Sequence, residues 1–246
     1  MGKLGRMDAR EKILTGGRIT QGVVRIGNTV RRPTGPHTPF VHSLMRHLEK
    51  AGFDGAPRVL GIDERRREIL AFIEGNVPQD LATWSDEQLV RAAELIRRFH
   101  DATAGSALAG EEEVVCHNDL SPCNTVFVKG MPSAFIDFDE AAPGPRSEDL
   151  GYASWLFLDL GAEDVDIYTQ GRRIRMMCDA YGLDDRFDAI GAIAQSQQAT
   201  LKRSLSRLRS GESQSTVAYA RESVRWIREE IAWLEAHWNE LEAAMG

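Results

Sequence analysis

The segment from residue 114 to residue 124 contains the side chains best suited to chemistry, His117, Asp119 and Asn124, at the spacing H-x-D-x-x-x-x-N. Phosphoryl transfer needs a carboxylate beside the attacking hydroxyl, to orient it and accept its proton. It also needs an amide oxygen that binds Mg²⁺ without adding charge. We therefore predict Asp119 as the catalytic base and Asn124 as a metal ligand. His117 is expected to be structural, because Asp119 already fills the role of base.

A second carboxylate is expected close to this loop. Residues 125–128 and 134–138 have the pattern of two strands around a turn at residues 129–133, and Asp137 stands where such a hairpin ends. A carboxylate there can bind Mg²⁺, so Asp137 is the second predicted metal ligand. A lone Asp in a loop is more often a turn former, but the order of loop, hairpin and carboxylate outweighs that reading. Asp139 has equal claims as a metal-site carboxylate and as a turn acid.

The elements that must position these residues change in type along the chain. Residues 13–32 contain short strands around a glycine-bearing turn, residues 40–51 show helical spacing, and residues 57–62 and 69–73 are expected to form a strand pair. The charged residues 63–68 are expected to connect that pair. The pattern is typical of a sheet with one helix.

The second half is expected to be mainly helical. Ser85 and Gln88 form a capping box ahead of an apolar run at helical spacing, and residues 150–245 carry further helical patterns. In the last of these, an apolar stripe indicates either a dimer interface or, more commonly, packing within the same chain. We expect a monomer or a homodimer.

Three segments together resemble a known family. Residues 117–124, 135–138 and 149–151 are similar to the H-x-D-x-x-x-x-N, I-D-[FW] and D-L-[AG] motifs of the aminoglycoside phosphotransferase and choline kinase superfamily. The resemblance implies an α+β, protein-kinase-like two-lobed fold. It implies a small antiparallel-sheet N-terminal lobe over residues 1–75 and a mainly helical C-terminal lobe over residues 76–246, with the nucleotide between them.

The resemblance also implies roles for further residues. Backbone groups of the lobe hinge, at Phe72, Ile73 and Glu74, would hold the adenine. Asp149 is expected to brace the catalytic loop. The glycine-bearing turn at residues 16–22 would cover the phosphates, although such glycines more often only make hairpins.

The chain departs from the family at the phosphate anchor. Kinases of this kind place a Lys on the third strand and pair it with a Glu on the next helix. Here the strand offers Arg31 or Arg32, and a guanidinium can clamp phosphate oxygens. Arg31 is the first choice and Arg32 the second. No acidic residue lies between residues 28 and 48, so the helical partner carboxylate is expected to be missing.

Composition limits the possible partners. The chain has 246 residues, a formal net charge of -7 and a polar start, and no stretch approaches the roughly 20 apolar residues of a membrane span. Three cysteines without a C-x-x-C pair argue against a zinc site and a disulfide framework. We expect a cytoplasmic protein with no nucleic-acid or membrane partner.

These observations predict a kinase that transfers the γ-phosphate of ATP or GTP, with Mg²⁺, to a hydroxyl of a small acceptor. An aminoglycoside-type antibiotic is one candidate acceptor. The missing Lys and Glu motivate an alternative, a nucleotide-binding pseudokinase or regulatory protein of the same fold. A protein kinase is disfavoured, because little room for an activation segment follows Asp137 and no A-P-E motif appears.

Overall fold

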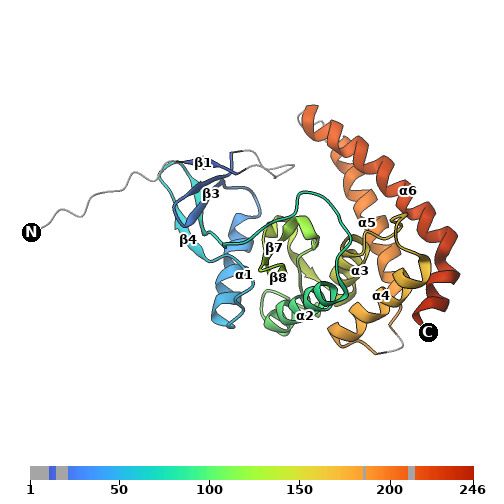
Figure 1. The fold of residues 1–246 in the computed structure, drawn as a ribbon. Coiled ribbons are helices and arrows are strands. Elements are labelled where there is room, and N and C mark those ends of the chain that lie inside the picture. The colour runs from blue at the N-terminus through green and yellow to red at the C-terminus, as the bar shows by residue number, and fades with distance from the viewer. Residues whose placement is uncertain (1–10, 15–21, 185–186, 210–213) are drawn as a thin grey trace, which may run out of the picture.

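The N-terminal part of the chain is a five-stranded antiparallel sheet (Figure 1). The computed structural model describes residues 11–14, 22–184, 187–209 and 214–246. The strands are β1 (Lys12–Ile13), β2 (Val24–Ile26), β3 (Thr29–Pro33), β4 (Val59–Ile62) and β5 (Arg67–Ala71), in the order β1-β2-β3-β5-β4. Most of the glycine-bearing turn, residues 15–21, lies outside the described residues. β3 is therefore flanked by β2 and β5, and its side chains alternate between the two faces of the sheet.

Helix α1 (Thr38–Lys50) follows β3, as the helical spacing predicts. Its apolar side chains Val41, Leu44, Met45 and Leu48 are buried, and Gly52 follows the helix with a φ of +78°. That left-handed conformation suits a glycine and ends the helix. The same buried face of α1 also carries Thr38 and His42, which are polar and turn towards β5.

The boundary of β5 corrects one expectation. Glu68 was expected in the connection between two strands, but it lies inside β5, opposite Arg32 of β3. Glu68 is only 3% exposed and shares the inward face of the strand with Leu70. The strand begins earlier than expected because Asp63 accepts hydrogen bonds from the backbone amides of Arg65 and Arg67, which closes the turn early.

The rest of the chain is mainly helical, with α2 (Asp86–Thr103), α3 (Arg146–Phe157), α4 (Ile167–Tyr181), α5 (Ala189–Arg209) and α6 (Gln214–Met245). Short strands and 3-10 turns lie between α2 and α3: β6 (Val114–Cys116), η1 (Pro122–Asn124), β7 (Thr125–Val128), β8 (Met131–Phe135), η2 (Phe138–Glu140) and β9 (Ala142–Gly144). The β7-β8 hairpin and the capping box of Ser85 and Gln88 are confirmed. The predicted α+β class is confirmed as well.

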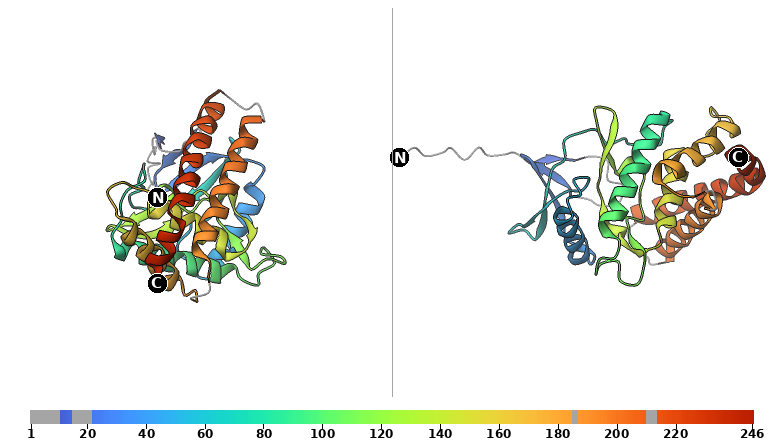
Figure 2. Two further views of the ribbon diagram at one scale, coloured as in Figure 1. Left: turned by 90° about the vertical axis from the view of Figure 1, so that its right-hand side faces the viewer. Right: turned by 90° about the horizontal axis from the view of Figure 1, so that it is seen from below.

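The apolar stripe of the last helix is buried within the chain. In α6 the residues Ala220, Val224, Ile227, Leu234 and Leu241 are buried, and the helix packs against α4 and α5. Figure 2 shows α6 along the outside of the helical part, away from the sheet. Packing within the chain therefore accounts for the stripe. Among the described residues, no helix is long and apolar enough to cross a membrane.

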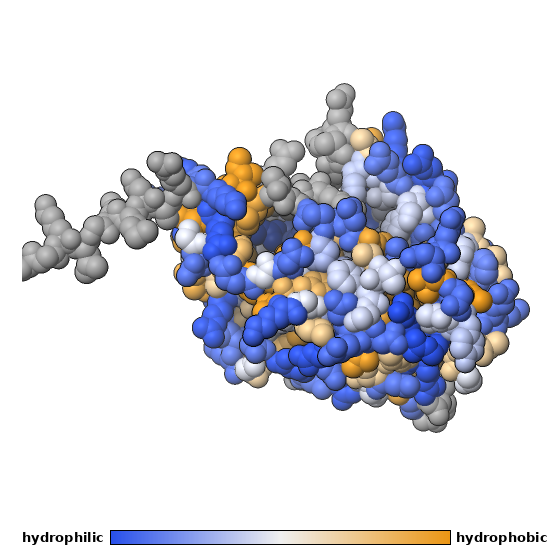
Figure 3. Space-filling view, viewed as in Figure 1, coloured by the Kyte–Doolittle hydropathy of each residue, from blue (hydrophilic) through white to orange (hydrophobic). Residues whose placement is uncertain are grey.

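An aromatic cluster connects the helical core to the loops that carry the predicted site. Phe99 of α2 lies against Phe53, Phe135 and Phe138, with ring centroids 5.8 to 6.4 Å apart. Phe138 is fully buried and directly follows Asp137. Between the strand-rich and helical parts, Figure 3 shows a hollow with hydrophilic residues inside it. The core therefore fixes the turn that begins with Phe138.

Candidate active site

Asp119 is held at both of its carboxylate oxygens. The hydroxyl of Tyr152 in α3 donates to Oδ1 at 2.7 Å, and Nδ2 of Asn124 donates to Oδ2 at 2.7 Å. Burial raises the pKa of Asp119 above its ordinary value, while the Tyr152 hydrogen bond and the nearby His117 act in the opposite direction. The carboxylate is therefore oriented, and it is more basic than a solvent-exposed Asp.

The amide of Asn124 has a defined orientation. Its Nδ2 donates to the backbone oxygen of Asp119 at 3.0 Å as well as to the carboxylate, so its Oδ1 is turned away from Asp119. The backbone oxygen of Asn124 accepts from the amide of Ile136, the residue before Asp137. The two predicted metal ligands therefore lie on hydrogen-bonded segments.

Asp137 has an uncommon backbone conformation. It has a φ of +64°, in the left-handed region, and immediately precedes the 3-10 turn that begins with Phe138. Asp tolerates that region better than most residues. The ring of Phe138 packs 4.4 Å from that of His117, whose Nε2 lies 3.0 Å from the backbone oxygen of Ile136. His117 thus has the structural position expected for it, and the anchored Phe138 fixes the turn that presents Asp137.

Arg32, rather than Arg31, reaches these carboxylates. Its guanidinium lies 3.1 Å from Oδ1 of Asp137 and also contacts Asp139. Arg31 lies on the other face of β3, where it donates to Thr29 and lies 3.8 Å from Asp63. Of the two predicted anchors, the second choice, Arg32, therefore reaches these carboxylates and the first choice, Arg31, does not, because strand alternation sends the two side chains to opposite faces.

The carboxylate partner of Arg32 comes from a strand and not from the helix. Oε1 of Glu68 lies 3.8 Å from Nε of Arg32, and Oε2 of Glu68 lies 2.8 Å from Nε2 of His42 in α1. Thr38 donates to Oε1 at 3.1 Å. The helical position expected to be without a carboxylate, near Val41 or His42, carries none, and His42 contacts Glu68 instead. The missed sequence signal was Glu68, an acid two residues before Leu70 and therefore on the same inward face of the strand.

The hinge segment leaves backbone groups without backbone partners. The amide of Phe72 donates to Asn28, and the amide of Asn76 donates to Phe127. Among the described residues, none forms a backbone hydrogen bond with Ile73 or Glu74. The side chain of Glu74 is ion-paired with Arg25, whose guanidinium lies over the ring of Phe72. Of the predicted adenine contacts, the amide of Phe72 is therefore already bonded, whereas the backbone groups of Ile73 and Glu74 have no backbone partner among the described residues.

Asp149 is the buried anchor of the catalytic loop. It is 0% exposed, and its two oxygens accept from the backbone amides of His117 and Asn118 at 2.7 Å each. His100 of α2 lies 3.0 Å from Oδ2 and bonds to Tyr181 through its other ring nitrogen. These hydrogen bonds hold the pKa of Asp149 below its ordinary value, against the effect of burial.

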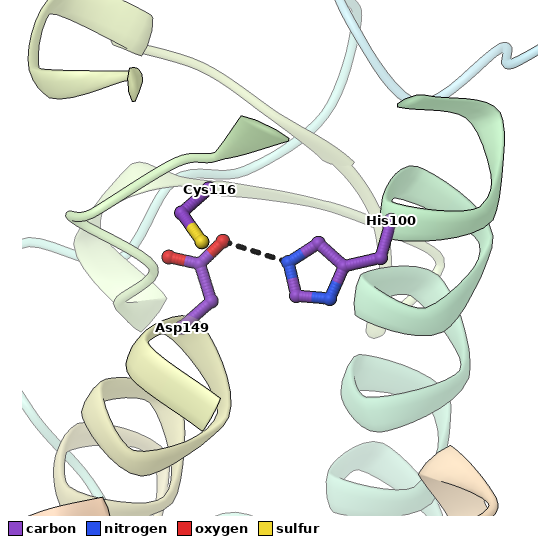
Figure 4. Close-up of side chains that lie close together, drawn as sticks. All are labelled: His100, Cys116 and Asp149. Atoms are coloured by element: carbon purple, nitrogen blue, oxygen red, sulfur yellow. Dashed lines mark hydrogen bonds and ion pairs between the residues drawn. The ribbon is translucent and has the colours of Figure 1, made fainter. Parts of the chain in front are cut away.

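Cys116 lies beside His100 and Asp149, so that the three residues offer metal-ligand atoms within 4.8 Å of one another (Figure 4). However, Sγ of Cys116 donates to the backbone oxygen of Pro145, and burial raises the pKa of the thiol far above its ordinary value. A metal would require the thiolate. The cluster is therefore a hydrogen-bonded brace.

The site opens into a cavity of about 170 Å³. Its floor comes from the loops that carry Asp119 and Asp137, and its far wall comes from α5 and α6. The lining residues are Asn118, Asp119, Asp137, Asp139, Glu140, Tyr152, Thr200, Arg203, Ser204, Arg207, Tyr219, Ser223, Trp226 and Ile227. Tyr152 was not found by sequence reasoning, because it lies 33 residues from Asp119. The cavity brings the predicted base and Asp137 to one surface.

Comparison with known proteins agrees with this arrangement. A model of the phosphotransferase enzyme family matches residues 61–182. The trifolitoxin immunity protein of Rhizobium leguminosarum bv. trifolii is 36% identical over 196 residues, which cover 70% of this chain and 74% of that protein.

Solved structures share the fold. A choline/ethanolamine kinase family protein from Mesorhizobium loti gives a TM-score of 0.58 at 17% identity, over 96% of this chain and 92% of that one. The GDP complex of wild-type aminoglycoside 2'-phosphotransferase-IIIa gives a TM-score of 0.58 at 14% identity, over 90% and 93%. The chain therefore belongs to the phosphotransferase enzyme family and has the protein-kinase-like fold of aminoglycoside phosphotransferases and choline kinases.

Proposed function

We propose that this protein is a kinase that transfers the γ-phosphate of ATP or GTP to a hydroxyl of a small molecule. The observation that carries the proposal is the orientation of Asp119 by Tyr152 and Asn124 at the floor of a cavity that also contains Asp137. A fixed carboxylate beside an acceptor cavity is what positioning of an attacking hydroxyl requires.

Asn124 and Asp137 are the proposed ligands of Mg²⁺. Their donors, an amide oxygen turned away from Asp119 and a carboxylate, are the hard oxygen ligands that Mg²⁺ prefers. When bound, the ion would neutralise charge on the nucleotide phosphates. Arg32 lies next to Asp137, so its guanidinium is placed to bind a phosphate oxygen.

The nucleotide is proposed to bind between the lobe of residues 1–75 and the lobe of residues 76–246. The hinge residues Phe72, Ile73 and Glu74 would contact the adenine through their backbone. Asp119 accepts the proton of the acceptor hydroxyl, and its raised pKa makes it a better base than an exposed Asp. Glu68 and His42 would act only through Arg32, because Glu68 lies 3.8 Å from Nε of Arg32 and His42 contacts Glu68.

The pair of Arg32 and Glu68 bears on the pseudokinase alternative. That alternative was motivated by a missing Lys and a missing helical Glu. In this structure the cation is Arg32 of β3, and the buried carboxylate is Glu68, 3.8 Å away. The acid therefore comes from strand β5 and not from the helix. This pair supports the kinase over the pseudokinase alternative.

The acceptor is proposed to be an antibacterial compound with a free hydroxyl. The support is the identity with an immunity protein and the structural likeness to an aminoglycoside phosphotransferase. We further propose action in the cytoplasm, as a monomer or homodimer, on a small molecule and not on a nucleic acid or a membrane.

Nucleotide consumption by the wild type and by Asp119→Asn tests the proposal. We expect acceptor-dependent release of ADP or GDP, with Mg²⁺, from a panel of aminoglycosides, amino alcohols, sugars and hydroxylated acids, and its loss on addition of EDTA. Asp119→Asn should lose at least about a hundredfold in turnover, since general-base positioning contributes roughly that much. Asp179→Asn, at an exposed carboxylate of α4, is the matched control and should keep full activity.

Equal turnover by wild type and Asp119→Asn would refute the assigned base. Nucleotide binding by the wild type without turnover of any acceptor on the panel would support the pseudokinase instead.

A further inference from the structure

The two sides of the cavity differ in charge. All four carboxylates among its described lining residues, Asp119, Asp137, Asp139 and Glu140, belong to the floor. The wall from α5 and α6 contributes hydroxyls, aromatic rings and two arginines: Thr200, Ser204, Ser223, Tyr219, Trp226, Arg203 and Arg207. A molecule bound over Asp119 therefore faces a wall that is polar and cationic.

Every carboxylate of the floor already has a partner. Tyr152 and Asn124 hold Asp119, and Arg32 contacts both Asp137 and Asp139. Glu140 is ion-paired with Arg207 at 2.7 Å. Within the described lining, no carboxylate is left over to bind an ammonium group of an acceptor.

Arg203 is the opposite case. It is half-buried in α5, and its guanidinium donates to Oγ1 of Thr200, one turn earlier on the same helix, at 3.0 Å. No carboxylate of the described residues lies within 4.0 Å of it. Burial raises the pKa of the nearby Glu148, and the charge of Arg203 only partly offsets that rise. A partly desolvated guanidinium that lines a cavity without an anionic partner is suited to an anionic ligand.

The same wall offers a flat apolar surface. Trp226 lines the cavity and stacks on Trp155, with ring centroids 4.9 Å apart and an angle of 11° between the planes. Trp155 is fixed in turn by a hydrogen bond from its Nε1 to Glu230 at 2.8 Å. A rigid indole pair of this kind favours a ring or another flat apolar group in the ligand.

From these contacts we infer that the acceptor carries an anionic group, bound by Arg203, and a flat apolar group beside Trp226, in addition to its reacting hydroxyl. This inference rests on the proposed function, which supplies the hydroxyl and the place of Asp119. Polycationic sugars are poor acceptors for this wall, because their ammonium groups meet Arg203 and Arg207 and find no unpaired carboxylate.

Calorimetric titration with three probes tests the inference. N-benzoylserine has a hydroxyl, a ring and a carboxylate, its primary amide lacks only the charge, and kanamycin is polycationic. We expect the acid to bind the wild type at least about tenfold more tightly than the amide, the effect of one charge-assisted contact. Kanamycin should bind more weakly than either.

Two variants assign that preference to one residue. Arg203→Gln should reduce the acid to the affinity of the amide while leaving the amide unchanged, which also shows that the variant is folded. Lys202→Gln makes the same charge change on an exposed neighbour outside the cavity and should keep the preference. The comparison of acid and amide on the wild type alone needs no variant.

The outcomes separate this inference from the proposed function, because binding needs no turnover. An Arg203-dependent preference for the acid, without phosphoryl transfer to any acceptor, supports the anionic-ligand site at Arg203 and counts against the proposed kinase. Turnover that depends on Asp119 but shows equal use of acid and amide, or preference for kanamycin, overturns the inference and keeps the kinase. Acid binding no tighter than amide binding, including no detectable binding, also overturns it.

Discussion

Replacing Asp149 by Asn exchanges one carboxylate oxygen for an NH₂ group and removes the negative charge that anchors the loop of residues 117–124. In the wild type Oδ1 accepts a hydrogen bond from the amide of Asn118 at 2.7 Å, and Oδ2 accepts one from the amide of His117 at 2.7 Å and one from Nε2 of His100 at 3.0 Å. The Asn side chain has only one acceptor oxygen, and its NH₂ group would face an amide donor. The charged hydrogen bond from the amide of His117 is lost, those from Asn118 and His100 no longer involve a charged acceptor, and the buried amide of His117 is left unpaired.

The cost follows from these losses. A hydrogen bond to a charged group contributes about 1.5–3 kcal/mol, and an unpaired buried donor costs about 1–3 kcal/mol. We therefore expect Asp149→Asn to lower the free energy of unfolding by about 3–5 kcal/mol. That is a large part of the free energy of unfolding of a typical native protein, which is roughly 5–15 kcal/mol. Turnover should fall too, because His117 and Asn118 set the backbone that carries Asp119.

Urea unfolding followed by tryptophan fluorescence measures the change. Tryptophan fluorescence reports on the core because Trp155 is buried in it, Trp226 stacks on Trp155, and Trp84, Trp233 and Trp238 pack against it. The depressed pKa of Asp149 means that its contribution is complete above its unfolded pKa, about 3.9, and is lost as the pH falls through the lower folded pKa. The difference between wild type and variant should therefore be full at pH 7 and shrink below about pH 4.

The exposed Asp179, ion-paired with Arg175 within α4, gives the control. Asp179→Asn should barely change stability, because such surface pairs contribute little. A loss below about 1 kcal/mol in Asp149→Asn, or a loss that does not depend on pH, would contradict the idea that the ionised carboxylate holds the loop.

Three further predictions concern the site and its support. Tyr152→Phe removes a hydrogen bond that lowers the pKa of Asp119, so the acidic limb of the kcat/KM profile should move to higher pH; an unchanged limb would argue against Asp119 as the base. Arg32→Gln should raise the KM for nucleotide about tenfold or more, whereas Arg31→Gln should change it by less than about twofold; the reverse order would reassign the anchor. Gly151→Ala should lower the melting temperature by several degrees, because a Cβ there would lie 2.3 Å from a backbone oxygen of α5; an unchanged melting temperature would show that α3 and α5 separate at little cost.

The sequence by itself determined the chemistry carried by short-range spacing. Asp119 and Asn124 are five residues apart in one loop, so their hydrogen bond is a local property. Asp137 follows because a hairpin returns the chain to that loop, and hairpin patterns are also local. The capping box at Ser85 and Gln88 was predictable for the same reason.

The tertiary structure decided contacts between distant segments. Arg32 and Asp137 are 105 residues apart, and the face on which each strand arginine lies depends on how the sheet packs over the loops. Glu68 became the partner of Arg32 only through the register of β3 and β5. No spacing rule in the sequence connects these residues.

The wall of the cavity formed by α5 and α6 also depends on contacts between distant segments. Tyr152, Arg203 and Trp226 lie on three different helices, and each would be an ordinary helical residue in a sequence alone. These three residues come together only because α3, α5 and α6 pack against one another. That packing is set by the burial of apolar side chains and not by the polar residues on the other faces of the helices. The sequence therefore determined the local arrangement of Asp119, Asn124 and Asp137, and only helix packing decided the opposite wall of the cavity.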